Sequence, residues 1–271
     1  MKPKNFIRSA FKMLTLRQKS LPQLIKKTEK VLPVIVTLTT IPSRINKVDI
    51  TIRSVLNQEH RPERIILWLN HELRGKLPQQ LTELEGESFQ INFRDLTSSH
   101  RKLIFALQEY PDHLLVTCDD DLIYHPQWLK KLYAAHLQHP KDIIANSCRK
   151  ITYQEGNLMP YKEWEVIKGK GVTDPRLVPI GFAGVLYPPN SLYQEATNSE
   201  LFMKLAPRAD DLWFKAMASL QGFQIRKPES QAPRPLHVIG SQGVSLSQGN
   251  VDQDMNRKQW QALVEYYKLE L

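Results

Sequence analysis

Cysteine is scarce in this chain: two of its 271 residues, Cys118 and Cys148, are cysteines. Neither stands in a CxxC pair or in a Cys/His cluster, which argues against a zinc site and against a redox-active pair. Both lie beside apolar stretches. We therefore expect two buried, reduced thiols.

Long hydrophobic runs are also missing. No apolar segment reaches the roughly 20 residues that a membrane-spanning helix needs. Arg17 and Lys19 interrupt the one stretch that resembles the core of a signal peptide. These absences predict a cytoplasmic protein. With 41% hydrophobic residues the chain can still build a sizeable core, and we expect one decorated domain.

Positive charge is concentrated at the start of the chain. The formal net charge is +9, and residues 1–30 hold nine basic residues against Glu29, which is +8 and leaves +1 for the rest. A basic tail of this kind attracts anionic lipid or nucleic acid. We therefore treat residues 1–30 as a basic extension of the fold.

This extension has a helical pattern. Apolar residues recur at helical spacing among basic ones: Phe6, Ala10, Met13 and Leu14 among Lys2, Arg8 and Lys12. An amphipathic helix of this composition can lie on an anionic membrane surface, which would make the protein peripheral at the inner face of the cell membrane. It can equally pack against the domain or extend into solvent. The sequence leaves these alternatives open.

Strands and helices alternate through the first half of the chain. Runs of mainly apolar residues predict strands at 34–38, 65–69, 113–118 and 143–146, and the alternation of apolar and polar residues predicts another at 89–93. Helical periodicity predicts helices at 45–56, 76–86, 100–110 and 128–137. The second half is less regular, with helices expected at 211–220 and 259–269 and glycine- and proline-rich loops before them.

The alternation predicts an α/β fold, a mainly parallel, Rossmann-like sheet flanked by helices. Ligands of such sheets bind beyond the carboxyl ends of the strands. That rule brings three polar segments to one rim, residues 39–44, 95–102 and 119–121.

Three consecutive aspartates at this rim are the sharpest chemical signal. Side chains at i and i+2 of an extended segment face the same way, so we expect Asp119 and Asp121 to converge. A hard divalent cation would relieve the repulsion between them, which predicts a site for Mg²⁺ or Mn²⁺. Asp120 points elsewhere in this scheme. The structural alternative, without a metal, is an acidic turn or a helix cap before Pro126.

Other charged residues have both a functional and an ordinary explanation. Arg101 and Lys102 open a helix, where they can hold a diphosphate or simply face solvent, and Arg44 has a similar status. Asp210 and Asp211 also open a helix, and one of them is explained as a cap while the other can serve as a general base.

Two further features complete the candidate site. A lone histidine such as His237 is more often structural than a ligand. Residues 181–184 form a glycine-containing turn, in which Gly181 and Gly184 allow a close approach of the backbone to a ligand or make an ordinary tight turn.

The order of these features resembles the GT-A type glycosyltransferases, especially the family 2-like enzymes of bacterial surface-polysaccharide loci. The resemblance extends over roughly residues 34–240, and the segments that carry it are 34–44, 54–58, 101–103, 115–124, 181–189 and 200–217. The resemblance implies a single GT-A type domain, with residues 31–150 as the half that binds the nucleotide sugar and residues 151–271 as the half that binds the acceptor.

The resemblance also implies roles for the residues. Thr39, Ile41 and Arg44 border the base and ribose of the donor, and Asp95 reaches one of them. Lys102, with Arg101, binds the diphosphate. Asp119 contacts the ribose or a metal-bound water, Asp121 binds the metal and His237 completes the metal site. We include Asp120 among the donor-binding residues. Gly181 and Gly184 lie beside donor sugar and acceptor, and Asp211 is the base of an inverting reaction. Asp210 departs from the family pattern, in which glutamate is commoner, and its role beside Asp211 is accordingly less defined.

The function that the resemblance implies is metal-dependent, inverting transfer of a sugar from a nucleotide donor, with UDP ranked first, to a bacterial surface glycan or lipid-linked glycan. One alternative is a sugar nucleotidyltransferase, but such enzymes usually have a glycine-rich basic loop after the first strand, and residues 39–44 have no glycine and one basic residue. The other is a non-catalytic binder of nucleic acid or other anions. Because the charge beyond residue 30 is nearly balanced, we expect no nucleic-acid partner.

Overall fold

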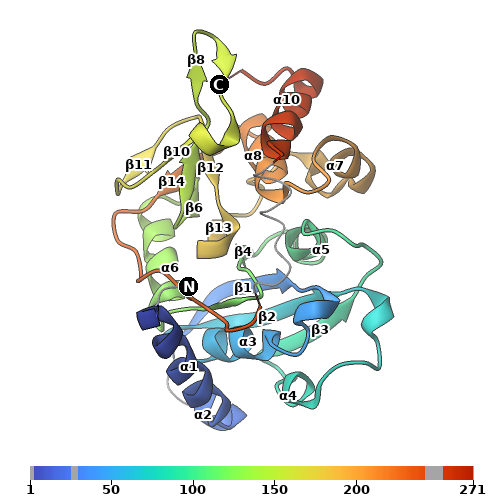
Figure 1. Cartoon of the computed structure of the whole chain (residues 1–271), viewed down its shortest axis with the longest axis vertical. Helices are drawn as coiled ribbons and strands as arrows, with labels where there is room; N and C mark the ends of the chain where they lie inside the picture. The colour runs from blue at the N-terminus through green and yellow to red at the C-terminus, as the bar shows by residue number, and fades with distance from the viewer. Residues whose placement is uncertain (1–2, 26–29, 242–252, 271) are drawn as a thin grey trace.

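A computed structural model describes residues 3–25, 30–241 and 253–270 of the chain (Figure 1). Its centre is an eight-stranded sheet in the order β11-β14-β6-β13-β4-β1-β2-β3. The strands are β1 (Val31–Thr39), β2 (Arg61–Leu69), β3 (Phe89–Phe93), β4 (Leu114–Thr117), β6 (Asp142–Ala145), β11 (Val172–Thr173), β13 (Val185–Tyr187) and β14 (Gln224–Lys227). Neighbouring strands β3, β2, β1 and β4 are parallel, and β13 is antiparallel to both β4 and β6. The expectation of a mainly parallel α/β sheet is confirmed.

Helices cover both faces of the sheet (Figure 1). They are α1 (Pro3–Arg17), α2 (Leu21–Ile25), α3 (Val48–Leu56), α4 (Gln79–Thr82), α5 (Arg101–Glu109), α6 (Trp128–Gln138), α7 (Ser199–Leu205), α8 (Asp210–Leu220) and α10 (Met255–Tyr267). Alternate residues of β1 enter two separate cores, since Val34 and Val36 pack with α3 while Ile35 packs on the side of α5 and α8. A strand buried on both faces accounts for the apolar run in its sequence, which only Thr37 interrupts.

Short strands form the remaining sheets. They are β5 (Leu122–Ile123) with β15 (Leu236–His237), β7 (Cys148–Lys150) with β10 (Glu165–Val166) and β12 (Leu177–Pro179), and β8 (Tyr153–Gln154) with β9 (Asn157–Leu158). The pairing of β5 with β15 matters for the site, because it brings residues 236–241 beside the aspartate triplet. Cys118 and Cys148 are free and buried, as predicted.

Two helices are shorter than the sequence predicts. The helix expected at 76–86 is reduced to α4, which begins after Pro78 and ends before the chain turns back through Gly86 into β3. The helix expected from residue 45 begins at Val48, because Pro42–Arg44 form a separate 3₁₀ turn.

The basic extension folds against the first half of the domain. α1 packs on α3, with Ser9 and Leu16 buried. The predicted helix is confirmed, but its exposed apolar face differs from the predicted one: Met13 is half-buried, while Ile7 and Phe11 are exposed. Lys2, Lys26, Lys27 and Glu29, which contribute to the charge of the extension, lie outside the described residues.

Candidate active site

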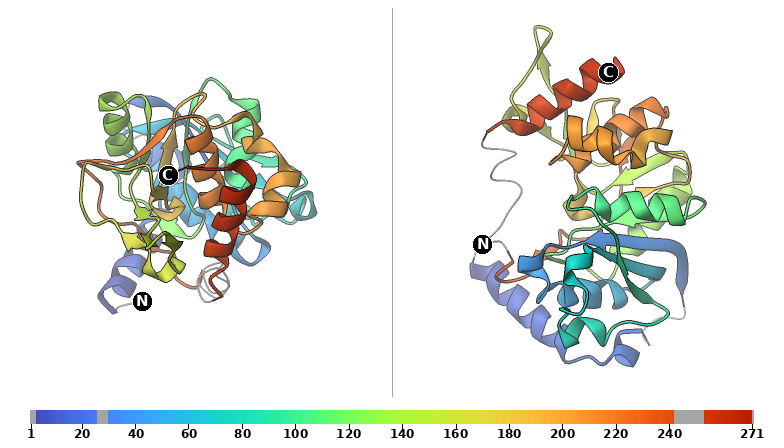
Figure 2. Two further views of the ribbon diagram at one scale, coloured as in Figure 1. Left: turned by 90° about the horizontal axis from the view of Figure 1, so that it is seen from above. Right: turned by 90° about the vertical axis from the view of Figure 1, so that its right-hand side faces the viewer.

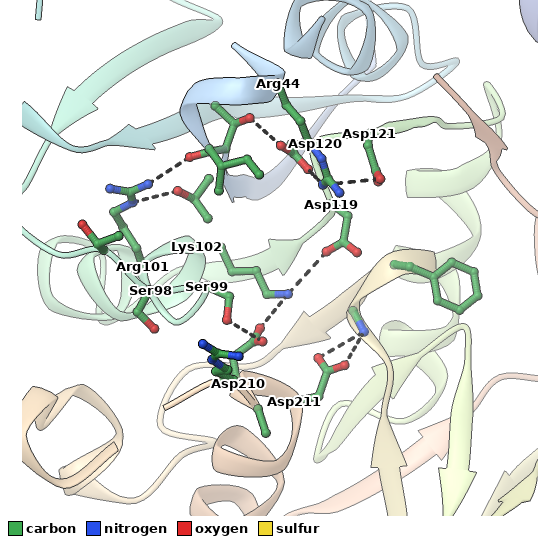
Figure 3. A pocket seen from close by; sticks show the side chains of 18 of the residues that line it. Arg44, Ser98, Ser99, Arg101, Lys102, Asp119, Asp120, Asp121, Asp210 and Asp211 are labelled. Carbon is green, nitrogen blue, oxygen red and sulfur yellow. Dashed lines mark hydrogen bonds and ion pairs between the residues drawn. The ribbon is translucent and has the colours of Figure 1, made fainter. Parts of the chain in front are cut away.

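A cavity of about 530 Å³ lies at the carboxyl ends of the parallel strands. Its wall includes the segments that follow β1, β3 and β4, which are the three segments that the sequence places at one rim. The second half of the chain supplies the opposite wall through Gly181 and the start of α8. The rim expected of a parallel sheet is therefore the place where the polar residues meet (Figure 3).

The aspartate triplet lies just beyond β4 and is held by cations and hydroxyls. Arg44 Nη1 is 2.7 Å from Asp120 Oδ1 and 3.4 Å from Asp121 Oδ2. The Thr40 hydroxyl donates a hydrogen bond to the other oxygen of Asp120. Burial, opposed by Arg44 and Thr40, raises the pKa of Asp120 to about 6. Asp120 is thus a buried anchor for Arg44.

The expectation that Asp119 and Asp121 converge while Asp120 points elsewhere is wrong. Asp119 points toward Lys102, while Asp120 and Asp121 lie together beside Arg44 (Figure 3). The reason is local: β4 ends at Thr117 and the chain turns at Asp120, so the two-residue period of an extended strand no longer applies.

Lys102 is a buried cation between the two halves of the site. Its Nζ lies 2.7 Å from Asp210 Oδ2 and 3.4 Å from Asp119 Oδ1. Burial by itself would lower the pKa of Lys102, but the neighbouring carboxylates raise it well above its ordinary value. The Ser99 hydroxyl donates to the other oxygen of Asp210 at 2.8 Å. Although burial opposes it, the charge of Lys102 lowers the pKa of Asp210. Asp210 therefore stays ionised.

The pKa of Asp211 is shifted in the opposite direction from that of Asp210. Asp211 lines the cavity, and both of its carboxylate oxygens are 3.2 Å from the backbone N–H of Gly181. Removal from solvent and the adjacent charge of Asp210 raise the pKa of Asp211 to about 7. Gly181 has no room for a side chain, because a Cβ there would lie 2.7 Å from Lys102 Nζ and 3.1 Å from Asp211 Oδ1. Two neighbouring carboxyl groups with pKa values pushed apart are typical of acid–base sites.

Arg101 is engaged by the protein itself, although it also lines the cavity. Its Nε donates to the Thr39 hydroxyl at 2.7 Å, and its two Nη atoms donate to the carbonyls of Leu96 (2.7 Å) and Thr40 (3.0 Å). Burial lowers the pKa of Arg101 to about 10. The guanidinium thus joins the segment after β1 to the segment after β3. Thr39 also donates to the Trp68 carbonyl, and Ile41 lines the cavity beside it.

Three predicted residues do not line the cavity: Asp95, Gly184 and His237. Asp95 is exposed. Gly184 has a φ of +96°, and a Cβ there would lie 2.6 Å from the Trp128 ring, so its role in this fold is a close approach of backbone to side chain. His237 lies on β15, next to Val238, whose N–H donates to the Asp121 carbonyl at 2.8 Å.

The residues that fit a metal ion do not form a complete set. Among residues 3–25, 30–241 and 253–270, no group of three or more His, Cys, Asp or Glu side chains is placed to hold a metal ion. Asp119 and Asp121 offer carboxylates to the cavity. His237 Nδ1 is buried and has no hydrogen-bond partner within the described chain. Mg²⁺ usually takes one or two carboxylates plus substrate phosphates, so this sparse set fits a cation that is completed by a substrate.

Sequence reasoning missed several residues of the wall. Ser99, which holds Asp210, stands in a polar run before α5 that reads as an ordinary helix start. Tyr161, Arg208 and Asn256 line the cavity from the second half. They belong to no motif or periodic pattern, and no signal in the sequence indicates that they meet.

Comparison with protein families adds the decisive observation. The model of glycosyl transferase family 2 matches residues 40–200, more than half of the chain. The chain belongs to glycosyl transferase family 2. Membership of this family, together with the order of the strands in the central sheet, confirms the expected GT-A type fold. The family also favours the glycosyltransferase hypothesis over the nucleotidyltransferase and nucleic-acid-binding alternatives.

The family 2 chain is also similar to solved structures, among them three at low identity. S. aureus TarS 1-349 is 15% identical with a TM-score of 0.43, and the match covers 73% of this chain and 58% of that one. The same protein in complex with UDP is 14% identical with a TM-score of 0.44, covering 72% and 58%. The 4-diphosphocytidyl-2C-methyl-D-erythritolsynthase of Anaerococcus prevotii DSM 20548 is 13% identical with a TM-score of 0.32, covering 54% and 66%. The chain thus spans less than two thirds of each structure's length. No curated protein sequence matches it.

Proposed function

We propose that this family 2 chain transfers a sugar from a nucleotide donor to a glycan hydroxyl, with Asp211 as the catalytic base. The observation that carries the proposal is the position of Asp211: a carboxylate on the cavity wall, oriented by the Gly181 N–H, with its pKa raised to about 7. A general base works best when its pKa lies near the working pH.

The chemistry assigned to Asp211 is a single displacement. Its carboxylate removes the proton of an acceptor hydroxyl, and the oxygen forms a bond to the anomeric carbon of the donor sugar. The bond from that carbon to the diphosphate breaks on the opposite side, so configuration inverts. The nucleoside diphosphate leaves with the electron pair, and the proton stays on Asp211.

Buried cations are suited to stabilise the departing diphosphate. Lys102 keeps its charge because three carboxylates surround it, and its Nζ lies at the cavity wall between the two halves. Arg44 lies across the cavity beside Asp120 and Asp121. Charges fixed before the reaction stabilise developing negative charge without reorganisation.

The charge of the wall supports a divalent cation. Within the described part of the chain, six carboxyl groups and four cations line the cavity, a formal balance of −2: Glu72, Asp119, Asp120, Asp121, Asp210 and Asp211 against Arg44, Arg101, Lys102 and Arg208. A diphosphate entering such a cavity meets net repulsion. We propose that Mg²⁺ or Mn²⁺ binds at Asp121 together with the diphosphate of the donor; Asp119 and His237, the other donors expected from the sequence, are not grouped with Asp121 as one ligand set in the described chain. When bound, the cation would neutralise charge on the leaving diphosphate.

The wall from the second half is the proposed acceptor side. Tyr161 and Asn256 contact each other there, and Asn256 Oδ1 is buried without a hydrogen-bond partner among the described residues. Both line the cavity, and the charge of Asp211 is close enough to Tyr161 to help raise the pKa of its hydroxyl. A buried amide oxygen in need of a donor fits a sugar hydroxyl. The proposed acceptor is a bacterial surface glycan or a lipid-linked glycan, and the proposed donor nucleotide is UDP, both from the resemblance of the sequence motifs.

The test of the base is Asp211→Asn, assayed for sugar transfer and for binding of UDP-sugars by thermal shift. We expect transfer to fall by about 10²- to 10⁴-fold, the usual contribution of a general base, with donor binding nearly unchanged. Asp112→Asn, an exposed residue away from the cavity, is the matched control. Transfer at the normal rate in Asp211→Asn would refute the assignment.

The test of the metal uses UDP binding with and without Mn²⁺. In the unaltered protein we expect UDP to raise the melting temperature strongly only with Mn²⁺. Asp121→Asn should lose this enhancement and bind metal-free UDP more tightly than the parent, because the wall is then less negative. An equal Mn²⁺ enhancement in parent and variant would exclude Asp121 as a ligand.

A further inference from the structure

Helix α1 exposes an unusual amount of apolar surface. Phe6, Ile7, Phe11 and Leu14 are 49%, 68%, 64% and 58% exposed. The other exposed large hydrophobic residues of the described chain are scattered singly over different elements. Single exposed apolar residues are normal, but a group on one helix marks an interaction surface.

These side chains form a ridge with a basic row beside it. Ile7, Phe11 and Leu14 stand at i, i+4 and i+7 and so share one face of the helix. Exposed basic residues at i, i+4 and i+8 form the adjacent stripe: Lys4, Arg8 and Lys12. Helix α1 contains no acidic residue. We call the ridge and the basic row together the outer face of α1.

The opposite side of the helix is fixed to the domain. Ser9 and Leu16 are buried against it, and the Ile239 N–H lies 3.3 Å from Met13 Sδ. Arg17 Nε forms an ion pair at 3.5 Å with the buried carboxylate of Asp49 in α3. Helix α1 lies along the outside of the molecule (Figure 2). Because the side with Ser9 and Leu16 is buried, the exposed outer face is turned away from the domain.

We propose that the outer face of α1 docks on the surface of an anionic lipid bilayer. An apolar ridge inserts among acyl chains while a basic row meets anionic head groups, which is how interfacial helices bind. A second copy of this chain is a poorer occupant, since a two-fold contact would bring the two basic rows together. Within the described residues no helix is long and apolar enough to cross a bilayer, so this face would lie on the membrane and not span it.

The packed side of α1, opposite the outer face, is connected to the candidate active site. Ile239 contacts Met13 of α1, and two residues on, the Ser241 carbonyl accepts a hydrogen bond of 3.0 Å from Arg44 Nε. Arg44 in turn pairs with the aspartate triplet. If the proposed function holds and the acceptor is lipid-linked, a bilayer at α1 would rest on a helix whose packed side contacts residues that follow β15 and border Arg44.

The experiment is co-sedimentation of the full chain with vesicles. Vesicles of phosphatidylcholine are compared with vesicles containing 30% phosphatidylglycerol, roughly the anionic content at which basic helices bind. We expect binding to the anionic vesicles and little to the neutral ones. Ile7→Ser combined with Phe11→Ser should lower the partition coefficient about 100-fold, since two large apolar side chains no longer insert. Lys4→Gln combined with Arg8→Gln should lower it roughly 20-fold, on anionic vesicles alone.

Matched controls keep the result interpretable. Leu137→Ser removes an apolar side chain that is 63% exposed on another helix, and it should bind vesicles like the parent. All substituted positions are exposed, so melting temperatures should not change. Failure of the parent to bind anionic vesicles, or equal binding by the Ile7/Phe11 variant, would overturn the proposal. So would a dimer in sedimentation velocity that this variant abolishes, since it would assign the face to a second copy. Vesicle binding involves no sugar transfer, so it is tested independently of the catalytic proposal.

Discussion

Replacing Asp211 with asparagine should make the protein more stable while removing its proposed base. The pKa of Asp211 is raised to about 7 in the folded chain, against about 4 when unfolded. Each unit of difference corresponds to about 1.4 kcal/mol, so the ionised carboxylate costs at most about 4 kcal/mol of folding free energy. Asp211 is only partly buried, and solvent screening reduces this to about 1–3 kcal/mol.

The sign of the pH dependence follows from the raised pKa. Near pH 4 and below, the native carboxyl is protonated, so the stability of the parent and of Asp211→Asn should be similar. As pH rises toward 7, the unfolded chain ionises Asp211 while the folded chain resists, and the parent loses stability. Above about pH 7 both forms are ionised, and the difference stays constant.

The assay is thermal unfolding of parent and variant from pH 5 to pH 9. We expect the melting temperature of Asp211→Asn to exceed that of the parent by about 2–8 °C at pH 8, with a smaller gain at pH 5. Asparagine can still accept the hydrogen bond from Gly181, so loss of that contact does not mask the effect. A variant that is less stable than the parent at pH 8, or a gain independent of pH, would refute the reasoning.

The remaining predictions concern glycines and a buried arginine. Gly184→Ala should lower the free energy of unfolding, measured in urea, by about 2–4 kcal/mol, because the residue has a φ of +96° and its Cβ would collide with a tryptophan ring. Gly222→Ala is the control: its φ is also positive but the space around it is open, so the loss should be about 1 kcal/mol. Gly181→Ala should lower transfer at least tenfold with little change in melting, since Lys102 must move. Arg101→Lys should destabilise the protein by about 2–3 kcal/mol, because the single nitrogen of an ammonium cannot reach the three acceptors that three different guanidinium nitrogens contact.

Much of the first half could be predicted because its signals are local. The run at 34–38 is apolar except for the buried Thr37, as expected of a strand covered on both faces, and its polar continuation at Thr39 marks the rim. The same logic applies to β4 and the aspartates after it. Once the strands are known to be parallel, their carboxyl ends meet at one edge, which is why the candidate cavity was predictable in place.

The second half could not be predicted in the same detail, since its elements are short and paired over long distances. β13 is three residues long and inserts antiparallel between β4 and β6. Tyr161 and Asn256 meet on the cavity wall although almost one hundred positions separate them. Such contacts depend on tertiary packing, which leaves no periodic trace in either segment.

The pair Arg101 and Lys102 shows where local reasoning ends even within the predicted half. The sequence shows two adjacent cations at the start of a helix, and nothing in it indicates which of them would bind a diphosphate. Adjacent helical residues point about 100° apart, so both cannot face one ligand equally. In the folded chain the guanidinium of Arg101 donates hydrogen bonds to oxygens at the end of β1 and just after it. The ammonium of Lys102 instead lies between the carboxylates of Asp119 and Asp210. The rotation of α5 about its axis decides that Arg101 links two segments of the protein while Lys102 faces the site. That rotation is fixed by the burial of Leu103 and Ile104 on the apolar face of the helix.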